Sequence, residues 1–358
     1  MSKRTTKSTR CKGVVLTRKD RVFVGLDVHK KSYHAAVRVN GVEVQTTVLA
    51  PKAEAVLAFL EPYRSACLHV VYEAGPTGFG LARALREAQI PAEVIAPSKT
   101  PQTPARENKT DRLDCRQLAL YDEKGMLRRV AVPTPQEEAD RQVIRLRDQV
   151  VKARRRVKQQ IKSFLLQHGV AEPPGLGSWS KASVRALETM PLAQTLRFCL
   201  DVMLVELAQR NESLQQVNRA VENLGQEPRH ARAVAPLQEH AGVGVITAMQ
   251  FRTELFRPER FANARQVAAY VGLAPRVSQS GGRCRTGPLL KAGRGRLRAL
   301  LVEAAWVWIR ADSEAAAVYR RLLHNTGQPN KAITGMARRL AIRLWRLLVP
   351  PEARGQAA

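Results

Sequence analysis

Acidic residues are scarce in this sequence. Its 358 residues include 31 Asp and Glu against 59 Lys and Arg, which gives a formal net charge of +28. Such an excess is uncommon among enzymes of neutral substrates, because Lys and Arg attract polyanions and displace counterions condensed on phosphate backbones. We therefore expect a nucleic acid as partner. The alternative is a basic surface that only keeps the protein in solution.

Cysteines are few and long apolar runs are missing. The five cysteines are scattered and form no C-x-x-C pair, which argues against a zinc module and a disulfide framework and suits a reducing cytoplasm. No apolar run reaches the roughly 18 residues of a membrane span. The basic N-terminus has no apolar core of the kind a secretory signal needs. We expect a cytoplasmic, nucleoid-associated protein without a membrane partner.

The hydrophobic content of 44% is enough for a large core and two or three domains. Residues 1–20 are interpreted as a flexible basic arm. Over 21–132, strand and helix signals alternate, and an Asn-Gly pair predicts a tight hairpin turn. This pattern predicts a mixed sheet covered by helices, and Pro133 and Pro135 mark its end.

The remaining chain is predicted to be helical, so the fold class is α/β plus α. Residues 136–228 carry two heptad runs separated by a Pro/Gly loop, which suits an antiparallel hairpin or a dimerising coiled coil. Ordinary packing within a helical domain explains the pattern equally well. Residues 229–349 form a third, mostly helical domain. The heptad positions are Val143, Leu146, Val150, Ala153, Val157 and Phe164, then Leu200, Met203, Leu207, Leu214, Val217, Val221 and Leu224.

Four carboxylates stand where local structure does not require them. Asp27 lies inside an apolar strand, which disfavours Asp, Glu73 ends a second strand, and Asp111 and Asp114 share one face at a helix start. Singly, Glu73 could satisfy a turn and Asp111 could complement the helix dipole. Together they would repel DNA unless cations lay between acid and phosphate. Mg²⁺ prefers such oxygen ligands, and a pair of ions about 4 Å apart activates phosphoryl transfer.

The segment VSQSGGRCRTG at 277–287 predicts a polar loop near phosphate. A serine here could attack phosphorus, or it could only donate a hydrogen bond to a bound phosphate. The residues alone favour the second interpretation. Arginines beside it would stabilise charge on phosphoryl oxygens. The polar residues concerned are Ser278, Ser280, Arg283 and Arg285.

Two further stretches predict contacts to phosphate. Gly242 and Gly244 could let backbone amides approach a phosphate at a helix start, although the residues alone favour a plain tight turn. Lys291 and Arg298 belong to a basic helix start that suits backbone phosphates better than bases.

Separated motifs in this sequence resemble one family. GLDVHKK, YEAGPTG and NKTDRLDCRQLA look like the three acidic motifs of the insertion-sequence-110 transposases, also called DEDD transposases. AYVGLAP and SGG follow in the order of that family's C-terminal domain. The resemblance implies a RuvC-like N-terminal domain of the RNase H type, with Asp27, Glu73, Asp111 and Asp114 as metal ligands. Cys115 stands where a small residue such as Ala is expected.

The resemblance also implies a function. The chain would be a transposase or recombinase that uses Ser280 as nucleophile, with Ser278 as the alternative. Strand exchange needs at least two DNA ends held together, which implies a dimer or tetramer, and a structured non-coding RNA could guide it. Two other functions remain open: a RuvC-like structure-specific endonuclease in which water attacks, and a nucleic-acid-binding protein without catalysis.

Overall fold

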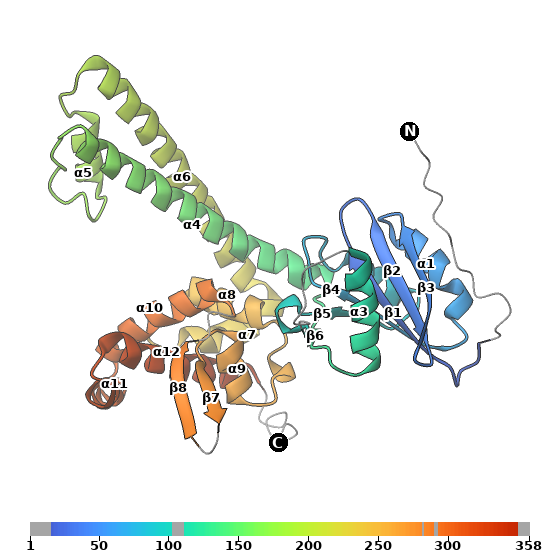
Figure 1. The fold of residues 1–358 in the computed structure, drawn as a ribbon. Coiled ribbons are helices and arrows are strands. Elements are labelled where there is room, and N and C mark those ends of the chain that lie inside the picture. Colours follow the sequence, from blue (N-terminus) through green and yellow to red (C-terminus); the bar gives the residue numbers. More distant parts are fainter. Residues whose placement is uncertain (1–15, 102–110, 281–282, 290–292, 350–358) are drawn as a thin grey trace. The chain divides into compact units, whose positions relative to one another are not determined.

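The computed structural model describes residues 16–101, 111–280, 283–289 and 293–349 (Figure 1). The chain divides into two compact units, Met1–Thr134 and Pro135–Ala358, the first built on a sheet and the second almost wholly helical. This confirms the predicted α/β plus α class. In the described part of the chain, no helix combines the length and apolarity that a membrane crossing needs.

The first unit has a six-stranded mixed sheet in the order β3-β2-β1-β4-β5-β6. β1 to β3 form an antiparallel meander, β4 runs parallel to β1, β5 runs parallel to β4, and β6 is antiparallel to β5. Asn40 and Gly41 join β2 to β3 with φ of 48° and 91°, the conformation of the predicted two-residue turn. The strands are β1 (Arg21–Val28), β2 (Tyr33–Val39), β3 (Val42–Leu49), β4 (Cys67–Glu73), β5 (Ala92–Ile95) and β6 (Arg129–Val130).

Alternation along the strands gives the sheet two buried faces. On one face, residues such as Leu26 and Tyr72 pack against Leu60 and Leu85 from two helices, α1 (Ala53–Leu60) and α2 (Gly80–Glu87). The other face is covered by α3 (Asp111–Glu123), and there Val71 and Ile95 pack against Leu118. Two short 3-10 helices, η1 (Glu61–Tyr63) and η2 (Pro97–Lys99), complete the described elements of this unit.

In the second unit, α4 (Pro135–Gln167) and α6 (Gln194–Gln226) run side by side as a long hairpin, with α5 (Lys181–Glu188) near its far end (Figure 1). Ser180 accepts a hydrogen bond from the Ser183 amide and so caps α5. The seam near that end is apolar and includes Val157, Ile161, Leu165, Leu187, Leu200, Leu204 and Leu207.

The heptad positions are correct on α6 and partly wrong on α4. Leu207, Leu214 and Val221 are buried as predicted, but Leu146 is 44% exposed. Ile144 is buried instead, because this part of α4 also joins a larger core with residues of α8 (Val245–Leu255) such as Met249. A helix packed on more than one side buries a wider stripe than a two-position seam.

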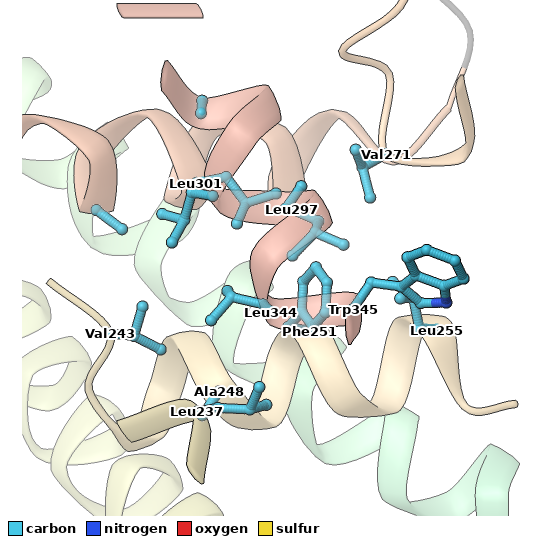
Figure 2. Close-up of a cluster of buried hydrophobic side chains, with 14 of the residues drawn as sticks. Leu237, Val243, Ala248, Phe251, Leu255, Val271, Leu297, Leu301, Leu344 and Trp345 are labelled. Atoms are coloured by element: carbon cyan, nitrogen blue, oxygen red, sulfur yellow. The ribbon is translucent and has the colours of Figure 1, made fainter. Parts of the chain in front are cut away.

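The remaining helices pack around this larger core, and Figure 2 shows Phe251, Leu297, Leu344 and Trp345 among its side chains. The elements are α7 (Pro228–Gln238), α8 (Val245–Leu255), η3 (Pro258–Arg260), α9 (Ala264–Tyr270), β7 (Pro275–Ser280), β8 (Arg283–Leu289), α10 (Gly295–Ala311), α11 (Ser313–Thr326) and α12 (Pro329–Leu348). The predicted boundary between residues 228 and 229 falls at the junction of α6 and α7, inside the second unit.

Candidate active site

Asp27 and Glu73 lie side by side at the carboxyl ends of β1 and β4. These strands are parallel, with Leu26 paired to Tyr72, so the next residue of each strand is one of the two carboxylates. Alternation puts both on the face that carries Gly25, the face covered by α3. Both side chains are partly buried.

The start of α3 lies over this same end of β1. At the carboxyl end of α3, Glu123 accepts a hydrogen bond from Arg38 Nε at 2.9 Å. Arg38 pairs with Phe23, which lies near the beginning of β1. In the middle, a Cβ on Gly25 would lie 2.1 Å from the Cys115 carbonyl oxygen, so the backbones of α3 and β1 are in direct contact. The helix therefore runs antiparallel to β1 and begins near Asp27.

Asp111 and Asp114 belong to this first turn of α3. Asp114 is partly buried, while the Asp111 side chain lies outside the described atoms. We call Asp27, Glu73 and the α3 start the acid edge. Its all-oxygen donors fit a hard cation such as Mg²⁺. Among the side chains that are described, no three His, Cys, Asp or Glu residues lie close enough together to hold a metal ion.

Neighbouring side chains orient both strand carboxylates. His29 Nε2 lies 2.9 Å from Asp27 Oδ2, and Thr100 Oγ1 donates to Glu73 Oε1 at 2.8 Å. Sequence reasoning missed both residues. The position of His29 two residues after Asp27 was a usable signal, whereas nothing local linked Thr100 to Glu73.

Cys115, a residue of α3, is fully buried. Burial, and secondarily the negative charge of Asp27, raises the pKa of its thiol to about 12. The thiol is therefore neutral at physiological pH and packs as a small apolar group. A cysteine here is compatible with the acid edge, where a small residue such as Ala was expected.

The predicted serine segment forms an antiparallel hairpin of β7 and β8, which we call the serine hairpin. Ser280 pairs with Arg283 at its tip, and Ser278 pairs with Arg285 two residue pairs away. Arg285 is exposed. The side chains of Ser278, Ser280 and Arg283 are outside the described atoms, as is all of Lys291.

The two glycines before α8 differ in their surroundings. Gly242 has φ of +84°, and a Cβ there would lie 2.4 Å from the Ala304 carbonyl oxygen, so packing against α10 requires glycine. A Cβ on Gly244 would meet nothing within 4 Å. Gly244 is also the N-cap of α8 and offers no side-chain cap. Of the two, only Gly244 leaves an open approach to a helix start.

Arg298, the last predicted phosphate contact, is partly buried in the first turn of α10. Its Nη1 donates to the Gly272 carbonyl oxygen at 3.2 Å. The guanidinium therefore helps to hold the loop after α9. A phosphate contact by Arg298 would use the N–H donors of its other nitrogen atoms.

Comparison with known proteins supplies the family. A model described as "Transposase IS116/IS110/IS902 family" matches residues 234–320, and a DEDD model of the IS110 type, described as "Transposase", matches residues 24–170. The y4qE protein of Sinorhizobium fredii, which carries a transposase name, is 31% identical over 296 residues, covering 80% of this chain and 71% of that protein.

Two further relatives are named for insertion sequences. "Transposase for insertion sequence element IS1111A" of Coxiella burnetii is 24% identical and covers 74% of this chain and 72% of its own length. "Transposase for insertion sequence element IS1533" of Leptospira borgpetersenii is 24% identical, covering 91% of this chain and 95% of its own length. The similarity extends through both compact units.

Proposed function

This chain belongs to the IS116/IS110/IS902 family of transposases, enzymes that cut and rejoin DNA, and we propose that it does so with a Mg²⁺-dependent carboxylate site and a serine nucleophile. The main support is the register of β1 and β4, which puts Asp27 beside Glu73 at one end of the sheet. The contact of α3 with Gly25 brings the helix start that carries Asp111 and Asp114 to the same end.

In this proposal Asp27, Glu73, Asp111 and Asp114 hold two Mg²⁺ ions. When bound, the ions would polarise the scissile phosphodiester and favour the deprotonated form of an attacking hydroxyl. The hydrogen bonds from His29 and Thr100 to the strand carboxylates fix the orientation of those ligands.

Ser280 is the proposed nucleophile, with Ser278 as the alternative. Ser280 Oγ forms a bond to phosphorus while a bond from phosphorus to a deoxyribose oxygen breaks, so that one strand becomes attached to the protein. Attack on that phosphorus by a hydroxyl of another strand releases the serine and rejoins DNA. Arg283 and Arg285 would stabilise charge on the phosphoryl oxygens. The hairpin sequence has no general base, so the serine depends on activation at the carboxylate site.

DNA is the substrate of the family, and the formal net charge of +28 suits it. Gly244 and Arg298 are proposed phosphate contacts, with Lys291 beside them in sequence. Recombination requires two DNA ends at once, so we propose a homodimer or homotetramer, with the α4–α6 hairpin as an available protein surface. A structured guide RNA is a further proposed partner.

The proposal is tested by DNA cleavage with Asp27→Asn, assayed on DNA that carries the element ends. The wild type should cut with Mg²⁺ and stop with EDTA, and Asp27→Asn should lose about a thousandfold or more in rate while it still binds DNA. Glu54→Gln makes the same chemical change at an exposed position of α1 and is the control. Equal rates for the wild type and Asp27→Asn would contradict the assignment.

A further inference from the structure

A pocket of about 510 Å³ lies between α4, α8 and the start of α10, within the second unit. We call it the α10 pocket. It combines residues that are distant in sequence. The residues used below are Arg145, Asp148, Lys152, Gln250, Glu254, Arg294 and Arg296.

The lining of the α10 pocket has an excess of positive charge. Its four cations outnumber its two acids, Asp148 and Glu254. Arg296 Nε binds Asp148 at 2.8 Å and Arg294 Nε binds Glu254 at 3.1 Å. Arg145 lies 3.5 Å from Glu254, and Lys152 is exposed on the same face of α4, two turns further along. The pocket therefore attracts an anion even after its internal ion pairs are formed.

The start of α10 adds a second attraction for an anion. This 17-residue helix has Arg294 as N-cap, and the Arg294 side chain makes no capping hydrogen bond to its first turn. Its amino end carries the positive end of the helix dipole. The approach is fixed in place, because Gly293 has φ of +96° and a Cβ there would lie 2.8 Å from the Gly272 nitrogen.

Gln250 supplies an independent indication of a ligand. It is 2% exposed and lines the pocket, yet its Oε1 has no hydrogen-bond partner among the described residues. Its Nε2 lies 3.5 Å from Asp148 Oδ2. Asp148 is ion-paired with Arg296 and can only accept, which fixes the orientation of the amide. A buried acceptor without a partner requires an explanation, and a ligand that donates a hydrogen bond provides one.

We propose that the α10 pocket binds one backbone phosphodiester of a nucleic acid strand. Arg145, Lys152 and the first-turn amides of α10 contact the phosphate oxygens, and Gln250 Oε1 accepts a hydrogen bond from the adjoining nucleotide. This rests on the proposed function and extends it, because it makes α4 part of the nucleic acid surface. Donors on bases occur in DNA and RNA, whereas a 2′-hydroxyl next to the phosphate occurs only in RNA.

The test compares two double variants of the full chain. Arg145→Ala with Lys152→Ala removes two charges from the pocket, and Arg320→Ala with Arg321→Ala removes two exposed charges from α11. Binding to a DNA and to an RNA of the same sequence is measured over a range of salt. The pocket variant should bind at least one of them about tenfold more weakly and show a salt slope smaller by about one.

The control variant should lose less than about twofold by the same salt-linkage argument. Equal losses for both variants, or no loss for the pocket variant, would overturn the proposal. Thermal unfolding checks that the variants are folded. If the pocket variant with two alanines does not fold, Arg145→Gln with Lys152→Gln is used in its place. A wild type that binds neither nucleic acid would instead refute the proposed function.

Gln250→Met removes the acceptor at similar volume and identifies the source of the phosphate. If it weakens RNA binding and leaves the matched 2′-deoxy strand unchanged, the pocket holds RNA. If it weakens both equally, the donor is on a base and DNA fits as well. If it changes neither, Gln250 has no part in the site and that contact is overturned.

Discussion

The acid edge of the first unit and the serine hairpin of the second unit are built in different ways. The acid edge lies on a six-stranded sheet between helices on both faces, and the backbone of α3 is pressed onto β1 at Gly25. The serine hairpin has only two strands, and its apolar side chain Val277 is 59% exposed. The carboxylates are therefore positioned by the core, whereas the serines are held mainly by a single ladder of backbone hydrogen bonds.

Because of this difference, substitutions at the two sites should affect stability and catalysis in different ways. A change beside the acid edge should disturb packing and catalysis together, because the same core holds both. A change of a side chain on the serine hairpin should remove chemistry and leave the fold intact, since the side chains described on this hairpin are exposed or half-buried.

Gly25→Ala should have the largest effect on stability. The new Cβ would lie 2.1 Å from the Cys115 carbonyl oxygen and 2.6 Å from the Ala119 nitrogen, so α3 must shift away from the sheet. We expect a loss of about 3–5 kcal/mol in the free energy of unfolding, measured by denaturant titration. Gly80→Ala, where a Cβ meets nothing within 4 Å, is the control and should change stability by less than about 1 kcal/mol. Similar losses for the two variants would refute the close α3–β1 contact.

Gly242→Ala and Gly244→Ala should separate packing from DNA contact in the second unit. Gly242 has positive φ and touches the Ala304 carbonyl oxygen, so its substitution should cost about 2–4 kcal/mol. Gly244→Ala should cost less than about 1 kcal/mol but weaken DNA binding, as measured by equilibrium titration. The reverse order of stabilities would contradict the two roles.

Asp140 shows how the second unit holds a buried carboxylate for structure alone. Burial would raise its pKa, but hydrogen bonds from Arg229, Gln136 and His230 outweigh burial and hold the pKa below its ordinary value. Its contribution to stability is therefore complete above about pH 4 and is lost as the pH falls below that value. Asp140→Asn should cost about 2 kcal/mol at pH 7, with a smaller difference from the wild type in acid. Thermal unfolding over a range of pH measures this difference in stability. A difference between Asp140→Asn and the wild type that grows in acid would refute this assignment.

Local patterns in the sequence predict much of the first unit and less of the second. A carboxylate inside an apolar strand identifies Asp27, and the Asn-Gly pair identifies the turn between β2 and β3. The seam of α6 follows from its heptads, but Ile144 replaces Leu146 on α4 because α4 also packs against other helices. No local signal shows that the backbone of α3 packs against Gly25, since that contact depends on tertiary packing.

In the candidate sites, too, local patterns predict some features, whereas contacts between distant segments are not predicted. The adjacency of Asp27 and Glu73 could be expected from the strands, because both residues lie at or near the carboxyl ends of their strands. The hydrogen bond from Thr100 to Glu73 could not be expected from the sequence, since Thr100 comes from the segment after β5. The α10 pocket depends on the ion pair of Asp148 with Arg296, which are 148 positions apart, so only the folded structure reveals it.

The central claim, that a serine of the hairpin attacks DNA with the help of the acid edge, is tested most directly by trapping the reaction and mapping the attachment. With Mg²⁺, the wild type and Ser278→Ala should carry DNA covalently bound at Ser280. Ser280→Ala and Asp27→Asn should bind DNA and form no such adduct. An adduct that persists in Ser280→Ala would contradict the choice of Ser280, and a wild type that cuts DNA with Mg²⁺ and never forms an adduct would contradict the serine mechanism.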